Sequence, residues 1–386
     1  MTNFYLTLRS FLLFLTISVY LTISAQPAGY YNAATGLTGE NLREALRVII
    51  TNGHTSNDYD NLEDDFYYTD NLGSSKVWDM YAMDQNGIAA YYYYYNTGDE
   101  CGSYSAEGDC YNKEHSFPKS WWGGSTGVIQ YADLFHLVPT DGYVNNRRSN
   151  YAFGEVTSPT WTSTNGSKVG PNTFPGGYTD VVFEPVDAYK GDFARNYFYM
   201  ATRYKNSFSS WTSTCPIISG DNYTEWTIDL LMDWNDLDPV SQKEIDRNNA
   251  VYTIQNNRNP YIDHPEYVNL VWGDGLDPEP SNYVTDFSAH CIVLNWVDAT
   301  GTTLPDGYLI RMSAIGFADI VAPSDGTAVS NDFYNKNQLY GVQTVTFGNL
   351  TPETTYYFKI FPYTGSGTSI DYKLDGDIPQ ISLTTN

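Results

Sequence analysis

A chain of 386 residues exceeds one ordinary domain, so two or more domains are expected. Its formal net charge is -25, from 45 acidic and 20 basic residues. That charge favours solubility and excludes an overall field that attracts polyanions, because phosphate affinity comes from lysine and arginine. A polyanion would need a local basic patch and a bound cation. The 35 tyrosines are typical of extracellular proteins with β-structure.

The first 25 residues have the pattern of a secretory signal peptide. Arg9 precedes an apolar run from Phe11 to Ile23, and the small residues Ser24 and Ala25 follow. A transmembrane anchor is the alternative, but threonine and serine interrupt the run, which is short for a bilayer span. We therefore expect export to the periplasm, the cell surface or the medium, with no membrane span elsewhere.

Four cysteines in an exported chain indicate disulfide chemistry. Cys101 and Cys110 are close in sequence and flank a short loop, so we expect them to be paired. Cys215 and Cys291 lie far apart, in different predicted domains. Two buried free thiols are the simplest interpretation of that second pair.

The elements expected before residue 274 are mostly helical. Thr38 is an N-cap candidate for a helix with apolar residues at helical spacing, ending at Asn52-Gly53. Residues 78–95, with their run of tyrosines, indicate β-structure. A second helix is predicted over 187–204, and a third begins at Asp238-Pro239, with proline in the first helical position. The chain then turns at Asn259-Pro260.

A change of pattern at residues 274–282 predicts a linker, because DGLDPEPSN is acidic and rich in proline. It separates a first domain, residues 26–273, from a second, residues 283–386. Short alternating strands at 290–296, 307–312, 342–347 and 355–360 predict a β-sandwich. A tryptophan in an early strand and LTPETTYYFKIFPY late in the chain resemble the fibronectin type III pattern.

Reactive side chains are densest between Cys110 and Val156. His115 has the ordinary pKa of about 6.5 that suits a general base near neutral pH. Glu114 offers a carboxylate oxygen to a hard cation such as Mg²⁺. Consecutive residues of a regular strand point to opposite faces, so the strand must end or bulge if both serve one site. The following Phe117-Pro118 is consistent with an ending.

The second half of this stretch predicts a loop at Pro139 to Gly142 and then a short helix. Asn145 would project from its first turns, and its amide oxygen suits Mg²⁺ or Ca²⁺. Arg148 follows about one turn later and is able to hold a phosphate. Turn formation and capping are an equal alternative for Asn145, Asn146 and Asn150. His136 is assigned a support role.

Four motifs in this order resemble the secreted bacterial endonuclease I family of ββα-metal nucleases. They are EHSFPKSWW, ADLFHLVPTDGYVNNRRSNYAFGEV, FEPVDAYKGDFARNYFYM and WNDLDPVSQKEIDRNNAVYTIQNNRNPYIDHPEY, and they span most of residues 40–272. The resemblance implies an α+β nuclease domain with a ββα-metal core, followed here by the all-β sandwich.

The resemblance also implies roles for individual residues. His115 would be the general base, and Glu114 with Asn145 would hold one Mg²⁺, with Mn²⁺ or Ca²⁺ as alternatives. The segment between Trp122 and Asp133 is shorter than in periplasmic members and lacks the cysteine-rich arm with its product-binding arginine. Arg148 and Arg195 are the alternatives for that role. The substrate contacts expected beyond these are Lys119, Arg147, Arg195 and His136.

The reaction implied is hydrolysis of phosphodiester bonds in DNA, with RNA as an alternative, giving 5′-phosphate ends with little sequence preference. His115 would deprotonate the attacking water. A carbohydrate-active or carbohydrate-binding protein is a second hypothesis, but no carboxylate pair stands out as acid and nucleophile. A surface adhesin that works through its sandwich is a third. We expect a monomer, and the sequence identifies no ligand for the sandwich.

Overall fold

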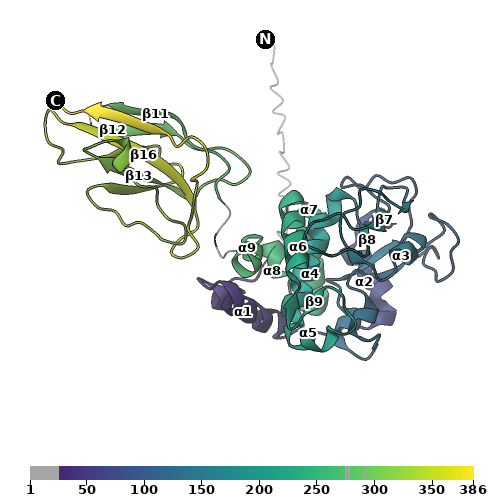
Figure 1. Ribbon diagram of the computed structural model, residues 1–386. Helices are drawn as coiled ribbons and strands as arrows, with labels where there is room; N and C mark the ends of the chain where they lie inside the picture. Colours follow the sequence, from purple (N-terminus) through teal and green to yellow (C-terminus); the bar gives the residue numbers. More distant parts are fainter. Residues whose placement is uncertain (1–25, 274–275, 277–278, 291) are drawn as a thin grey trace, which may run out of the picture.

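A computed structural model describes residues 26–273, 276, 279–290 and 292–386 (Figure 1). The predicted signal peptide, most of the first half of the predicted linker and Cys291 lie outside these residues. Figure 1 shows helices throughout the first unit and a separate group of strands in the C-terminal unit. Among the described residues, no helix has both the length and the apolarity to cross a bilayer.

The helices of the first unit surround one that is buried along its whole length, α4. α4 packs against α1 and α6. The predicted helix starting after Thr38 is confirmed as α1, and the helix predicted over 187–204 is confirmed as a 3-10 turn followed by α4. The helices are α1 (Gly39–Thr51), α2 (Leu62–Thr69), α3 (Gly142–Arg148), α4 (Lys190–Arg203), α5 (Lys205–Trp211), α6 (Glu225–Leu237), α7 (Gln242–Gln255), α8 (Pro260–Asp263) and α9 (Glu266–Trp272).

The β-structure predicted over residues 78–95 is wrong. Within this described stretch the chain forms only isolated bridges, such as Met83 with Ala89. The tyrosine side chains form hydrogen bonds with distant residues instead. The hydroxyl of Tyr93 donates to the Asp141 carboxylate, and that of Tyr95 donates to the Asp70 backbone carbonyl. A tyrosine run is therefore compatible with an irregular segment whose rings are anchored one by one.

The helix start predicted at Asp238-Pro239 is also wrong. Asp238 is the C-cap of α6, and the next helix, α7, begins at Gln242. Ser241 caps α7, and Glu244 bonds back to the Ser241 backbone in a capping box. That reciprocal pair satisfies the backbone N–H groups of Ser241 and Glu244 at the start of α7. The predicted turn at Asn259-Pro260 is the start of α8, with Asn259 as its cap.

The hairpin of β3 (Tyr111–His115) and β4 (Leu137–Asp141) is followed at once by α3. The strands are antiparallel and pair His115 with Leu137 and Glu114 with Val138. α3 packs against both strands. A second sheet has the order β5-β8-β7-β6, and two further hairpins are β1–β2 and β9–β10. These strands are β1 (Asn71–Gly73), β2 (Lys76–Val77), β5 (Ala152–Phe153), β6 (Trp161–Thr162), β7 (Lys168–Pro171), β8 (Val181–Glu184), β9 (Ile218–Ser219) and β10 (Asn222–Tyr223).

The C-terminal unit has two sheets, of order β11-β12-β15 and β14-β13-β16-β17, with β18 also paired to β16. Trp296 of one sheet and Tyr308 and Phe358 of the other share one core, as a sandwich requires. The strands predicted at 307–312, 342–347 and 355–360 match β13, β15 and β16. The range 290–296 includes the last residue of β11 and most of β12. The strands are β11 (Thr285–His290), β12 (Val293–Val297), β13 (Gly307–Ser313), β14 (Asn335–Leu339), β15 (Thr344–Thr346), β16 (Thr355–Thr364), β17 (Asp371–Tyr372) and β18 (Gln380–Thr384). Its fibronectin type III character stays a prediction.

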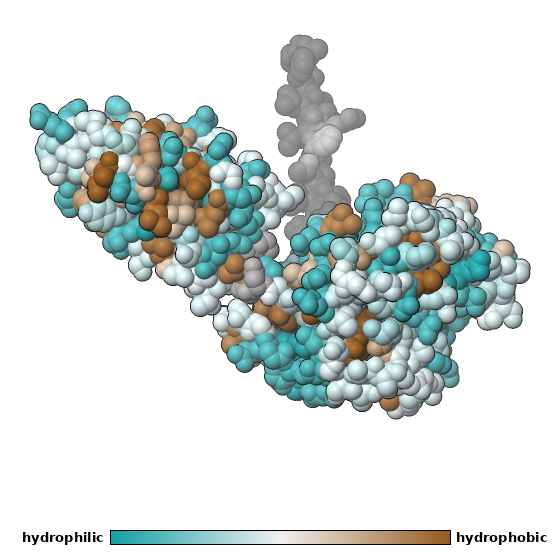
Figure 2. Space-filling view, in the orientation of Figure 1, coloured by the Kyte–Doolittle hydropathy of each residue, from teal (hydrophilic) through white to brown (hydrophobic). Residues whose placement is uncertain are grey.

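The C-terminal unit also exposes apolar side chains. Ile315, Val321 and Leu339 are among them, and Figure 2 shows apolar patches on the visible face of this unit. Such exposed residues are common on soluble domains and by themselves define no site.

Candidate active site

The candidate site is built at the junction of β3, β4 and α3. Strand β3 ends at His115, and the backbone N–H of Ser116 then donates to the His136 carbonyl. The strand thus ends directly after His115, and its pairing is regular through Glu114 and His115, without a bulge. At the end of β4, Oδ1 of Asp141 accepts a bond of 2.9 Å from the Val144 N–H and so caps α3. The helix is thereby held directly against the strand that carries the reactive pair.

A disulfide joins Cys101 and Cys110, as predicted, with Cα atoms 5.7 Å apart. The loop it closes reaches α3, because a Cβ at Gly142 would lie 2.6 Å from the Tyr104 ring. The Cys110 carbonyl also accepts from the Gly142 N–H at 2.9 Å. The disulfide loop therefore fixes the first residue of the helix. Cys215 is a buried free thiol.

Glu114 turns into the protein and is only 3 % exposed. Its Oε1 accepts a hydrogen bond of 3.0 Å from the Tyr81 hydroxyl and lies 3.3 Å from Nη1 of Arg148. Burial raises the pKa of this carboxyl, and Arg148 and the Tyr81 bond oppose the rise. Both contacts use the same oxygen, so Oε2 takes no part in them.

Asn145 lies beside a residue that the sequence reasoning missed, Asn112. Its Nδ2 donates to Oδ1 of Asn112 at 2.8 Å, which leaves the Asn145 Oδ1 outside that bond. Asn112 and Glu114 are two residues apart on β3 and share one face of the strand. The alternation of side chains along a strand, counted back two residues from Glu114, would have indicated Asn112.

These residues fit one hard divalent cation. A carboxylate and amide oxygens are the donors that Mg²⁺ and Ca²⁺ accept, and Mg²⁺ keeps several of its waters in protein sites. No group of three histidine, cysteine, aspartate or glutamate residues able to hold a metal occurs in the described part of the chain. The oxygen donors that this face would offer are the carboxylate of Glu114 and the side-chain amides of Asn112 and Asn145.

His115 leaves β3 on the opposite face from Glu114 and is enclosed by rings. Its ring stacks on Tyr59 and Tyr131, with centroids 5.6 and 5.4 Å away. Nε2 lies 3.0 Å from the Tyr131 carbonyl oxygen. A carbonyl only accepts, so a neutral ring must carry its proton on Nε2 and its lone pair on Nδ1. The ordinary pKa of about 6.5 expected from the sequence is not kept. Burial, with His136 nearby, lowers the pKa of His115 to about 3, so the ring is neutral at pH 7.

Arg148 and His136 support the site from inside. Arg148 is 1 % exposed, and its guanidinium donates to the backbone carbonyls of His115 and Ser116 and to the Tyr197 hydroxyl. His136 is fully buried, donates from Nε2 to the Gln130 carbonyl at 2.7 Å and lies 5.5 Å from the His115 ring. Both side chains are thus buried and in contact with the protein itself, whereas the sequence predicted a phosphate contact for Arg148 and a substrate contact for His136.

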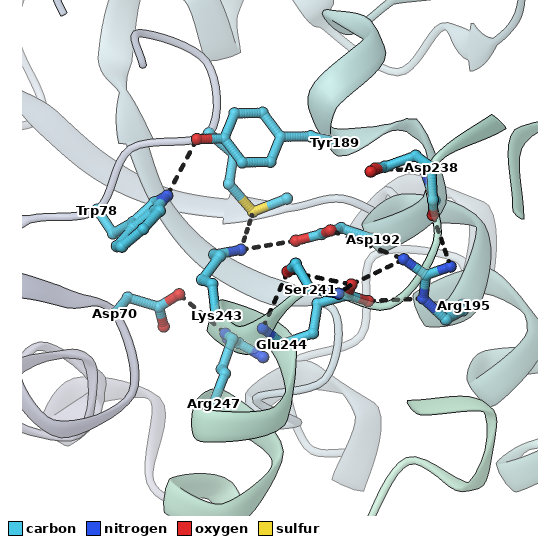
Figure 3. Close-up of polar contacts among 12 residues, drawn as sticks. Asp70, Trp78, Tyr189, Asp192, Arg195, Asp238, Ser241, Lys243, Glu244 and Arg247 are labelled. Atoms are coloured by element: carbon cyan, nitrogen blue, oxygen red, sulfur yellow. Dashed lines mark hydrogen bonds and ion pairs between the residues drawn. The ribbon is translucent and has the colours of Figure 1, made fainter. Parts of the chain in front are cut away.

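The structure does not bring Arg195 to the site. It lies on α4 with no exposed surface, and its Nε and Nη2 bond to the Glu244 carboxylate at 2.6 and 2.7 Å (Figure 3). Its remaining nitrogen, Nη1, donates to Asn235 and to the Asp238 carbonyl. All three guanidinium nitrogens of Arg195 therefore bond to α7 or to the end of α6, and none is available to a phosphate.

Lys119 and Arg147 are the exposed cations near the hairpin end. Nζ of Lys119 lies 5.7 Å from the Tyr131 ring. The Arg147 guanidinium lies 5.6 Å from the Tyr143 ring and 5.4 Å from the Trp161 ring. Neither makes a salt bridge to a described residue, whereas Lys113 is paired with Glu100 at 3.0 Å. These two side chains are therefore available to bind phosphates.

Comparison with known proteins identifies the class. The Endonuclease I family matches residues 38–266. The chain is 34 % identical over 263 residues to an extracellular ribonuclease of Bacillus amyloliquefaciens, covering 67 % of this chain and 82 % of that protein. It is 32 % identical over 247 residues to an extracellular ribonuclease of Bacillus subtilis (strain 168), covering 63 % and 78 %. An Endonuclease-1 of Buchnera aphidicola subsp. Acyrthosiphon pisum (strain APS) is 27 % identical over 131 residues, covering 34 % and 44 %.

The protein is thus a nuclease, a hydrolase of phosphodiester bonds. More particularly, the chain belongs to the Endonuclease I family, in which dependence on a divalent metal is typical. The resemblance seen in the sequence is confirmed.

Proposed function

We propose that this protein is an exported endonuclease that cleaves nucleic acids with little sequence preference, using one divalent ion and His115 as general base. The observation that supports the proposal is the 3.0 Å contact of His115 Nε2 with the Tyr131 carbonyl oxygen, which leaves the lone pair of the neutral ring on Nδ1. His115 is the last residue of β3, the strand that also carries Glu114. The hairpin and α3 would then form the ββα-metal core.

Residues of this chain take catalytic, substrate-binding and positioning roles. Nδ1 of His115 accepts the proton of the attacking water, and the Tyr131 carbonyl stabilises the ring as it becomes charged. Lys119 and Arg147 bind the phosphates on either side of the cleaved bond. Arg148, which bonds to two carbonyls at the end of β3, keeps His115 and Glu114 in place. In this assignment Arg148 is a positioning residue.

Glu114 and Asn145, with Asn112 beside them, would hold the ion. When bound, a divalent ion supplies charge stabilisation to the phosphate and to the leaving oxygen. We propose Mg²⁺, with Mn²⁺ and Ca²⁺ as alternatives, because each accepts oxygen donors. Bonds from the protein to phosphates carry no sequence information, which is why little preference is expected.

The substrate is DNA or RNA, and the proposed products carry 5′-phosphates. Two relatives are named extracellular ribonucleases, which favours RNA among the substrates. The same names and the signal-peptide pattern support export. We propose that the protein acts as a monomer outside the cytoplasm.

A nicking assay tests this function. Supercoiled plasmid and a folded RNA are incubated with the protein and Mg²⁺, and a parallel sample contains a chelator. We expect cleavage of either substrate only with the ion. Intact substrates under both conditions, together with hydrolysis of a polysaccharide, would instead favour the carbohydrate hypothesis.

A further inference from the structure

A groove of about 680 Å³ opens one ring away from His115. One wall is the loop 56–60 before α2, and the other is the segment 126–132 before β4. Tyr59 and Tyr131 line the groove, stack on each other with centroids 4.3 Å apart, and both stack on the His115 ring. The volume lies within the range of about 300–1,000 Å³ that is usual for small-molecule sites.

The lining suits a neutral aromatic group better than a phosphate. No lysine or arginine is among the described residues of the groove wall, and two of those residues are the exposed carboxylates Asp58 and Asp60. Carboxylates repel phosphates but accept hydrogen bonds from the amino groups of bases. Val128, Ile129 and the two tyrosines supply apolar surface.

Two lysines lie near the rings but are not among the groove residues. Nζ of Lys113, which is paired with Glu100, is 5.2 Å from the Tyr59 ring, and Nζ of Lys119 is 5.7 Å from the Tyr131 ring. Lys119 makes no salt bridge to a described residue, so it is the cation here that suits a phosphate. The acidic, partly apolar groove suits the base.

We propose that this groove binds the unstacked base of a nucleotide beside the cleaved bond, and that the enzyme therefore prefers single-stranded nucleic acid to duplex. A base inside a double helix is stacked and paired, so it enters a pocket only after it has been extruded from the duplex. The inference rests on the proposed function, because it places the cleaved phosphate at His115.

The test uses the full-length protein and three matched substrates. These are a single-stranded oligodeoxynucleotide, the same strand with one abasic site, and the duplex. We expect faster cleavage of the single strand than of the duplex. Base–aromatic stacking is worth about 1–3 kcal/mol, so a bond next to the abasic site should be cut about tenfold less than its neighbours.

Two variants test the groove itself. Tyr59→Ala removes a ring, and Gly127→Leu adds a side chain at a residue that lines the groove. Gly127 tolerates a side chain, since a Cβ there meets nothing within 4 Å. Gly127→Leu should lower single-strand cleavage about tenfold and leave duplex cleavage nearly unchanged. Tyr59 also stacks on the His115 ring, so Tyr59→Ala should slow both reactions, but single-strand cleavage about tenfold more than duplex cleavage. Tyr68→Ala, at a tyrosine that is 72 % exposed and outside the groove, is the control and should change neither rate.

The inference is overturned if the abasic site leaves the cleavage ladder even, or if both variants slow single-strand and duplex cleavage by one factor. The latter result would mean that the tyrosine merely supports the His115 ring. A wild-type protein that cleaves none of the substrates with Mg²⁺ would overturn the proposed function instead, and this inference with it.

Discussion

Nη1 of Arg148 lies 3.3 Å from Oε1 of Glu114, and both side chains are almost completely buried. The same guanidinium donates to the carbonyls of His115 and Ser116. One side chain of α3 therefore fixes the end of β3 on both faces: the carboxylate on one, and the backbone that carries the imidazole on the other.

Replacing Arg148 should cost stability and activity together. Breaking a buried ion pair leaves a charge uncompensated, so Arg148→Ala should lower the free energy of unfolding by about 3–5 kcal/mol. Arg148→Lys keeps the charge but loses the planar fork, so an intermediate loss is expected. Urea unfolding followed by tryptophan fluorescence measures both. An alanine variant as stable as wild type would refute the positioning role.

Base and ligand variants should respond differently to metal. His115→Ala should lose about 10²–10⁴-fold in cleavage rate, because general base catalysis contributes that much, and added Mg²⁺ should not restore it. Glu114→Ala and Asn145→Ala should weaken metal binding, so raising Mg²⁺ should restore part of their activity. Asn146→Ala, an exposed neighbour on α3, is the control. Recovery of His115→Ala with metal, without recovery of Asn145→Ala, would reverse the two assignments.

Removing the exposed cations should weaken substrate binding and its dependence on salt. Lys119→Ala and Arg147→Ala should each raise KM and reduce the slope of log affinity against log salt by about 1, since each removes one phosphate contact. With few free cations near the site, the wild-type slope should itself be shallow. Binding of an uncleaved oligonucleotide in chelator, measured by fluorescence anisotropy at several salt concentrations, reports the slope. Lys336→Ala, on β14, should change nothing.

Asp238 should make stability depend on pH. Burial, with Asp192 nearby, raises the pKa of its carboxyl to about 6 from an ordinary 3.8. The folded chain therefore holds this proton more tightly than the unfolded chain, and stability from this group is lost as pH rises from about 4 through 6.

Asp238→Asn removes that titration. The stability of the variant relative to wild type should thus improve by about 1 kcal/mol between pH 4 and pH 7, a modest value because the carboxyl is partly exposed and screened. Chemical unfolding of both proteins at several pH values gives the difference. A difference that is constant with pH would contradict the raised pKa.

Local sequence patterns were sufficient to predict much of this structure. The helix of residues 39–51 follows from an N-cap and apolar spacing, and the end of β3 at His115 follows from the proline turn after it. The disulfide follows from two close cysteines in an exported chain. Each of these depends on neighbours within a few residues.

Contacts between distant residues were beyond such patterns. Arg195 is committed to Glu244, which is 49 residues away, so its type alone did not show that it was unavailable. Asn112 gains meaning only because α3 brings Asn145 beside it. Residues 78–95 end in a run of tyrosines that is typical of strands, yet the hydroxyls of Tyr93 and Tyr95 bond to Asp141 and Asp70, and the segment is irregular.

The first unit should carry the whole activity without the sandwich. The two units have separate cores. The core of the first unit runs from Tyr31 to Leu270, and the two cores of the C-terminal unit begin at Val284 and Leu309. Every candidate site residue lies in the first unit.

A fragment of residues 26–276 retains the Leu276 carbonyl that accepts from Asn269 at 2.7 Å, so the end of α9 keeps its contact. Domains with their own cores fold alone, so cleavage within about twofold of the full chain is expected. Circular dichroism checks the fold of the fragment, and the nicking assay its rate. A folded fragment that cannot cleave would show that the sandwich contributes to the site.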